Sequence, residues 1–199
     1  MTTARDLALV ALGMPSDRSV AQGDLSLALA GAEAIDLLES GALSLAGGRM
    51  VPRLPVATGD RLLDQADALL TRREPYETVD EWLWRRGGEL AAAYVDDLER
   101  AGLVTHPRGH FGLRSARTVL ADSQARRSAE ERRASGEPVL AALLAAAGIG
   151  EDPAEARESL TDDAVTTVLA AVGDAVTQLE AVRLRRDVEN AAFDNVWRG

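Results

Sequence analysis

Apolar residues recur three and four positions apart along most of the chain, and runs of β-branched residues are rare. This spacing predicts a mainly helical protein. A core helix is predicted over residues 26–39, where Leu29, Ala32 and Ile35 share one face. Asp36 falls on or beside that face, so it is either a boundary residue or a buried carboxylate that accepts hydrogen bonds.

The same spacing predicts further helices over residues 3–12, 60–70, 78–86, 90–100, 116–134, 138–148 and 164–186. Thr78 and Glu81 have the spacing of a capping box. Trp82 and Trp84 are two positions apart, so on a helix they face different directions, one inward and one more exposed. The tail from residue 190 carries Phe193 and Trp197 and is expected to dock onto the body as a terminal turn.

Two segments have the pattern of β-hairpins. Residues 42–45 and 49–51 flank Gly47-Gly48, and residues 103–106 and 111–113 flank a Pro-Arg-Gly turn. A helix followed by a hairpin is also how a winged-helix domain ends, which keeps a nucleic-acid binder as an alternative. The helix over residues 90–100 is acidic, however, and would repel phosphate, so we expect no nucleic-acid partner.

Charge and length narrow the class of protein. The 199 residues suit a single domain over residues 1–199. Acidic residues outnumber basic ones 32 to 22, and every base is an arginine, which gives a net charge of −10. This balance argues against non-specific binding of nucleic acid. Residues 106–133 are locally basic, as either a solvated helix face or a surface for anionic lipid or an acidic protein.

The sequence offers no recognisable catalytic or metal-binding motif. The absence of cysteine excludes disulfides, thiolate metal sites and cysteine nucleophiles. The only histidines, His106 and His110, lack further ligands at a suggestive spacing, so no metal site is expected. Phosphate-binding and hydrolase motifs are also missing. We therefore expect no enzyme activity and no cofactor.

Four patches, in this order along the chain, resemble the Golgi phosphoprotein 3-like family. They are Leu29-Ala30-Gly31-Ala32 with Asp36-Leu37-Leu38 and Gly41, then residues 58–64, then residues 78–83 with 98–104, and finally residues 159–163. Together they cover most of the chain. The composition, rich in alanine and with arginine as its only base, fits an actinobacterial member.

The resemblance implies a fold and a function. The expected fold is mainly α, with a central helical bundle surrounded by amphipathic helices and one or two short β-hairpins. The expected function is that of a non-enzymatic peripheral membrane adaptor in the cytoplasm, at the inner face of the membrane. Eukaryotic members bind phosphatidylinositol 4-phosphate through arginines or lysines and a nearby tryptophan. The alternative is a protein-interaction or self-assembling module without lipid binding.

The family's headgroup ligands have no basic counterparts in this sequence. The family tryptophan falls at Ala21, one arginine at Ala30, and the basic pair at Gly88 and Ala91. Alanine and glycine side chains offer no charge-assisted donors to a phosphate. Three arginines lie near these stretches and are either ligands of a displaced anion site or solvated surface residues: Arg18, Arg85 and Arg86.

In the family, the first hairpin helps protomers assemble. Here residues 42–56 either pair two protomers through the strand edge or fold back on their own core. The apolar candidates for such an interface are Leu43, Leu45, Met50, Val51 and Leu54. Expected partners are therefore anionic phospholipid headgroups, a protein partner, or a second copy bound through the hairpin.

Overall fold

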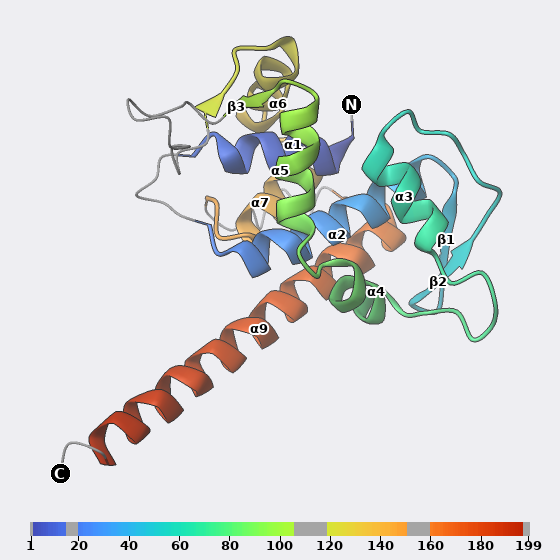
Figure 1. Ribbon diagram of the computed structural model, residues 1–199. Coiled ribbons are helices and arrows are strands. Elements are labelled where there is room, and N and C mark those ends of the chain that lie inside the picture. Colours follow the sequence, from blue (N-terminus) through green and yellow to red (C-terminus); the bar gives the residue numbers. More distant parts are fainter. Residues whose placement is uncertain (1, 15–19, 106–118, 151–159, 197–199) are drawn as a thin grey trace.

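The computed structural model describes residues 2–14, 20–105, 119–150 and 160–196. Their elements are, in chain order, α1 Thr3–Leu12, α2 Gln22–Glu39, β1 Leu43–Ala46, β2 Arg49–Pro52, α3 Arg61–Leu69, α4 Val79–Arg86, α5 Leu90–Arg100, β3 Val104–Thr105, β4 Val119–Leu120, α6 Gln124–Ala134, α7 Pro138–Ala146 and α9 Asp163–Val196. The predicted mainly α fold with short hairpins is confirmed (Figure 1).

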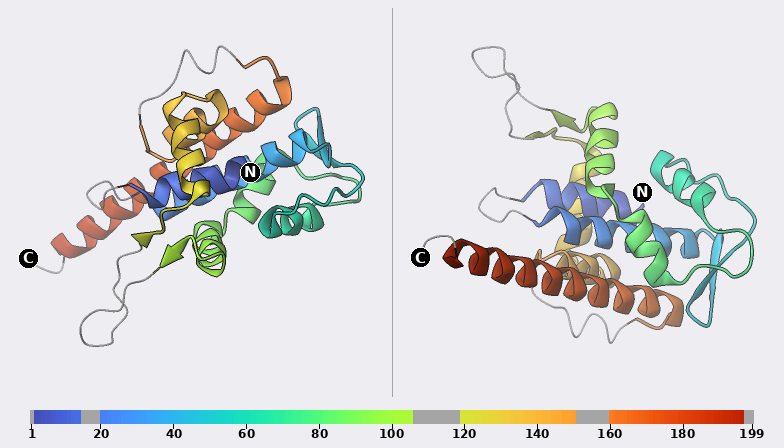
Figure 2. Two further views of the ribbon diagram at one scale, coloured as in Figure 1. Left: turned by 90° about the horizontal axis from the view of Figure 1, so that it is seen from above. Right: turned by 60° about the horizontal axis from the view of Figure 1, so that its bottom comes forward.

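Helix α2 is the centre of the bundle. Every residue from Leu25 to Leu37 is buried, because α2 packs against α1, α3, α4, α5, α7 and α9 (Figures 1 and 2). A helix that is apolar on all sides is expected in such a place. Its crossing with α9 is close, since a Cβ on Gly31 would overlap the Val172 methyl group and one on Gly23 would lie 2.7 Å from Leu179 Cδ2. Glycine allows this approach of the two helices.

The first hairpin lies against the body. Strands β1 and β2 pair with Leu45 opposite Met50, and Gly47 and Gly48 take positive φ values in the turn. The Met50 N–H donates to the Glu77 carbonyl (2.8 Å), and the Val79 N–H donates to the Gly48 carbonyl (3.2 Å). The segment before α4 therefore covers part of the outer edge of β2.

The second hairpin pairs differently from the prediction. Val104 and Thr105 in β3 pair with Leu120 and Val119 in β4, whereas the predicted return strand, residues 111–113, lies outside the described residues. The next helix begins at Gln124 rather than near residue 116, because Ser123 caps α6 by accepting the Arg126 N–H. The sequence pattern did not mark this cap within a run of small and basic residues.

Helix α9 is longer than predicted. It continues past residue 186 to Val196 and projects from the body, so the prediction of a docked terminal turn is wrong for residues 190–196 (Figures 1 and 2). Trp197 lies outside the described residues. By length and composition alone, Asp163–Asn190 is the one described helix that could cross a membrane. Its first half, however, contributes Val165, Val168 and Val172 to the core.

A buried ion pair joins α2 to α4. The Glu33 side chain in α2 is 0% exposed, and the Arg86 side chain in α4 is 9% exposed. Arg86 Nε and Nη2 donate to the two Glu33 carboxylate oxygens at 2.7 and 2.9 Å, and the Tyr94 hydroxyl in α5 donates to the same carboxylate at 3.1 Å. Burial raises the pKa of Glu33, while Arg86 and Tyr94 act in the opposite direction. The three side chains fix α4 and α5 relative to α2.

Two further polar contacts hold the ends of the bundle. The buried Trp82 indole donates to the Ala30 carbonyl at 3.0 Å. The Asp36 carboxylate accepts the Thr3 and Ala4 N–H groups at 2.8 and 3.0 Å, which satisfies the first turn of α1. Of the two alternatives for Asp36, the buried and hydrogen-bonded carboxylate is the observed one. Burial raises its pKa to about 6, against the opposing effect of the two backbone donors.

Replacing Arg86 with alanine is expected to destabilise the fold strongly. The Glu33 carboxylate would be left buried without its cation, and breaking such a pair typically costs about 3–5 kcal/mol. The matched control is Arg61→Ala, whose pair with Asp97 is half exposed, with an expected loss of about 0–1 kcal/mol. Chemical denaturation followed by circular dichroism measures both losses. Equal losses of unfolding free energy in the two variants would show that the buried ion pair contributes no more to stability than an exposed one.

The pKa of Asp36 predicts a pH dependence of stability. Because its folded pKa of about 6 lies above the model-peptide value of 3.8, the folded state binds the extra proton. The stabilisation is present below pH 4 and is lost as the pH rises through 6, about 3 kcal/mol in all. Unfolding free energies measured from pH 4 to 7.5 should therefore fall more for the wild type than for Asp36→Asn. Parallel curves for the two proteins would contradict this prediction.

Candidate functional site: the cleft between α2, α5 and α9

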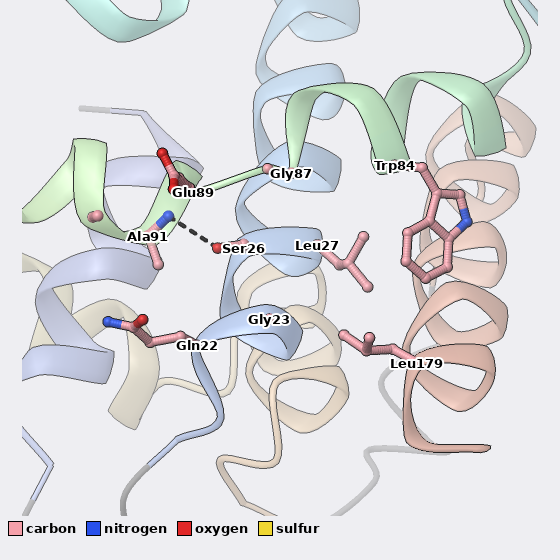
Figure 3. A pocket seen from close by; sticks show the side chains of 11 residues that line it. Gln22, Gly23, Ser26, Leu27, Trp84, Gly87, Glu89, Ala91 and Leu179 are labelled. Atoms are coloured by element: carbon pink, nitrogen blue, oxygen red, sulfur yellow. Dashed lines mark hydrogen bonds between the residues drawn. The ribbon is translucent and has the colours of Figure 1, made fainter. Parts of the chain in front are cut away.

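A cleft of about 550 Å³ opens where the first turns of α2 and α5 meet α4 and α9. It is lined by Gln22, Gly23, Ser26, Leu27, Trp84, Gly87, Gly88, Glu89, Ala91, Ala92 and Leu179. Figure 3 shows Leu27, Trp84 and Leu179 turned toward one another on one side, with Gln22 and Glu89 on the other. The cleft thus has an apolar wall and a polar rim.

The connection between α4 and α5 shapes the cleft. Gly87 ends α4, and a Cβ there would lie 2.6 Å from the Leu83 carbonyl oxygen and 3.3 Å from Leu27 Cδ2, so only glycine fits against α2. Glu89 follows in the left-handed conformation, with φ 58°, and begins α5. The Ala91 N–H then donates to the buried Ser26 hydroxyl oxygen at 3.0 Å, which joins the start of α5 to α2 (Figure 3).

Among the described residues that line this cleft none is cationic, and the one charged residue is Glu89. Neither Ala21, the N-cap of α2, nor Glu89, the N-cap of α5, makes a side-chain capping bond. The favourable potential for an anion therefore comes from two helix N-termini. A helix dipole attracts an anion less strongly than a guanidinium does, and the negative charge of Glu89 opposes it here. The chemistry of the cleft suits a neutral or partly apolar group.

Three of the four positions at which the family resemblance implies headgroup ligands lie in or beside this cleft. Gly88 and Ala91 line it, and Ala21 directly precedes its first lining residue, Gln22. The fourth, Ala30, is fully buried on α2 and is not a lining residue. The structure therefore brings together three positions that are far apart in the sequence, and their small side chains add no charge to the cleft.

Of the three displaced candidates, Arg85 and Arg86 do not line the cleft. Arg18 lies outside the described residues. Arg85 is held by the Glu77 carboxylate, with Nη2 donating at 2.7 Å, and its guanidinium lies 5.2 Å from the centre of the Trp82 ring. Arg86 is occupied by Glu33. A displaced anion site at these arginines stays a prediction, and the carboxylates that already neutralise Arg85 and Arg86 weigh against it.

The five hairpin candidates divide between the core and the surface. Leu43 and Met50 are buried, and Leu45 packs against the core. Val51 is half-buried, and Leu54 is 84% exposed. Pairing of protomers through this hairpin stays a prediction, but of the five side chains only Leu54 is largely free to take part.

Sequence reasoning found part of this site. The opposite directions of Trp82 and Trp84 are confirmed, since Trp82 is fully buried and Trp84 is 40% exposed in the cleft wall. Gln22, Ser26 and Leu179 were not predicted as site residues, and no local pattern distinguishes them. In the part of the chain that the structure describes, no group of three or more His, Cys, Asp or Glu side chains is placed to hold a metal ion.

Comparison with known proteins agrees with the fold and the four sequence patches. Residues 4–192 match the family described as Golgi phosphoprotein 3 (GPP34). No curated protein gives a significant match to the chain. Because the family match extends over nearly the whole sequence, from the first turn of α1 to the far end of α9, the chain belongs to the Golgi phosphoprotein 3 (GPP34) family.

Proposed function

We propose that the chain is a non-enzymatic adaptor that attaches to an anionic membrane surface from the cytoplasm, and that it does so through its hairpin end rather than through the cleft. The hairpin end is defined here as residues 42–57 and 69–76. The observation that carries the proposal is the grouping there of exposed apolar side chains with arginines, three of which form no ion pair with a described residue.

The apolar part of the hairpin end consists of Leu54, Val56 and Leu69, which are all exposed. Arg72 connects the two segments, because its Nη1 donates to the Arg53 carbonyl at 3.1 Å while Nη2 pairs with Asp67 at 2.9 Å. Exposed apolar side chains of this size can enter the boundary between lipid headgroups and acyl chains.

The basic part consists of Arg49, Arg53 and Arg73. None of them forms an ion pair with any described residue, although Arg49 is near enough to Glu81 to add to the effect of the Thr78 hydrogen bonds, which lower the pKa of that carboxyl. Most other described arginines are paired, as Arg61 is with Asp97. Residues 42–57 and 69–76 contain four arginines, and their only acidic residue is Glu74. This end is therefore positive on a protein of net charge −10, and unpaired arginines favour an anionic headgroup by about 1 kcal/mol each.

Vesicle co-sedimentation tests the proposal. Binding is expected to vesicles that contain phosphatidylglycerol, to be weaker on neutral phosphatidylcholine, and to decrease with added salt, because the contact is local on an acidic protein. Phosphatidylinositol 4-phosphate at equal total charge should add nothing, because no cationic side chain is among the described residues that line the cleft. Arg53→Ala/Arg73→Ala should weaken binding roughly thirtyfold.

The matched control is Arg61→Ala/Arg127→Ala, which removes two exposed arginines away from the hairpin end. It should bind like the wild type. Equal losses in both double variants would mean that net charge alone drives binding. Preference for phosphatidylinositol 4-phosphate at matched charge would mean that the chain binds this headgroup as the family resemblance implies.

A protein-interaction or self-assembling module without lipid binding is the second candidate function. The projecting end of α9 favours it, because its exposed Leu184 and Val188 lie among basic and acidic residues in equal balance rather than in a positive patch. No sedimentation of the wild type with any anionic vesicle would select this candidate.

A further inference from the structure

The projecting half of α9 carries an apolar stripe that stands largely free of the described residues. Leu184 is 59% exposed and Val188 is 69% exposed, and their spacing of four positions places both on one face of the helix. Figures 1 and 2 show this half of α9 extending beyond the body. In proteins, most of the stability of a helix comes from packing of its apolar face against a neighbour. The stripe is therefore a surface that a partner can cover.

The stripe begins at a pocket between α7 and α9. The pocket has a volume of about 510 Å³, and Ala145 and Ala146 at the end of α7 line it together with Val176 and Glu180 of α9. Leu184 lines the pocket as well, so the pocket opens directly onto the stripe. Pocket and stripe together are the α7–α9 surface, defined as Ala145, Ala146, Val176, Glu180, Leu184, Asp187 and Val188.

The carboxylates on this surface give it a negative charge. At about 100° of rotation per residue, Glu180 and Asp187 lie about 40° and 60° from Leu184 on one side, and Val188 lies about 40° from it on the other. Both carboxylates are exposed. Neither forms a hydrogen bond or an ion pair with any residue that the structure describes. Both are therefore available to a cation on a partner.

The arginines of α9 leave this charge in place. Arg183 lines the pocket, but it pairs at 2.7 Å with Asp24, which lines the pocket too. Arg185 and Arg186 lie about 100° and 160° around the helix from Leu184, so they point to other sides. The end of α7 adds the negative end of a helix dipole, and its last turn has no basic residue.

We infer that the α7–α9 surface binds a partner protein through a basic amphipathic helix. Apolar side chains of that helix cover Leu184 and Val188, and an arginine or lysine enters the pocket beside Glu180. The apolar contacts supply the buried area, and the two carboxylates select the sign of the partner's charge. An anionic membrane does not suit this surface, because Glu180 and Asp187 would face negative headgroups.

This surface is separate from the hairpin end. Figures 1 and 2 show the hairpin of β1 and β2 and the far end of α9 on opposite sides of the molecule. Binding of a basic helix at α9 therefore leaves the arginines of the hairpin end free. The inference does not depend on attachment of the hairpin end to a membrane, and the two can be tested separately.

Fluorescence anisotropy with a labelled peptide and the full-length chain tests the inference. The probe is a helical peptide of leucine, alanine and arginine, about 18 residues or five turns long, with its leucines three and four positions apart. It is expected to bind the wild type, and added salt should weaken the binding. The same peptide with glutamate in place of arginine should not bind.

Charge reversals locate the binding site. Glu180→Arg/Asp187→Arg should raise the dissociation constant of the basic peptide roughly thirtyfold. The matched control is Glu131→Arg/Glu189→Arg, which changes the net charge equally at exposed glutamates off the surface and should retain most of the affinity. Equal weakening in the two double variants would mean that net charge alone attracts the peptide, and it would overturn the inference.

A truncation on the stripe tests the apolar contact. Leu184→Ala should raise the dissociation constant roughly tenfold, whereas Val182→Ala should have no effect, because Val182 lies about 160° around the helix. Binding of the two anionic vesicle types by Leu184→Ala should equal that of the wild type. A loss of vesicle binding in this variant would place α9 on the membrane and overturn the inference.

Two other results would also overturn the inference. One is that the acidic peptide binds as well as the basic one, or that the basic peptide does not bind at its highest soluble concentration. The other is that the wild type self-associates in sedimentation velocity and Leu184→Ala abolishes the association, since the stripe would then be covered by a second copy of the chain.

Discussion

The arrangement of this protein depends on one buried ion pair. Glu33 sits in the middle of the central helix, where it cannot be solvated, and Arg86 together with Tyr94 satisfies its carboxylate. This contact holds the end of α4 against the core. Gly87 and Glu89 then change the direction of the chain, so that α5 begins beside α2. The cleft exists because of that turn. The same contact removes Arg86 from the surface, where it would otherwise be available to an anion.

Three of the four positions at which the family resemblance implies headgroup ligands, Ala21, Gly88 and Ala91, lie in or beside the cleft, and none of them is basic. Gly88 and Ala91 stand where the family resemblance implies basic residues, and the described lining contains only one charged group, Glu89. Unpaired arginines occur elsewhere, at the hairpin end and on α9. A net-positive surface with exposed leucine suits an anionic membrane.

Sequence reasoning reached most of the helices and the first hairpin, because amphipathic spacing, the Thr78 capping box and Gly47-Gly48 are local signals. It failed where contacts between residues far apart in the sequence determine the position of a side chain or the end of a helix. Arg86 looked like a surface residue, since nothing near it in sequence shows that Glu33, 53 positions away, is buried. The extent of α9 was missed because charged residues interrupt the apolar pattern near residue 186, although the helix itself continues to Val196. Leu179 lines the cleft because α9 packs against α2, and no local sequence pattern predicts that contact.

The central claim is that the cleft, with no cationic side chain among its described lining residues, does not bind a phosphate group. Its most direct test is a nuclear magnetic resonance titration with a water-soluble short-chain phosphatidylinositol 4-phosphate. The backbone amides of Gly87, Gly88 and Ala91 and the indole of Trp84 report on the cleft. The account predicts no saturable shift of these signals. A saturable shift confined to them, with one ligand bound per chain, would contradict it.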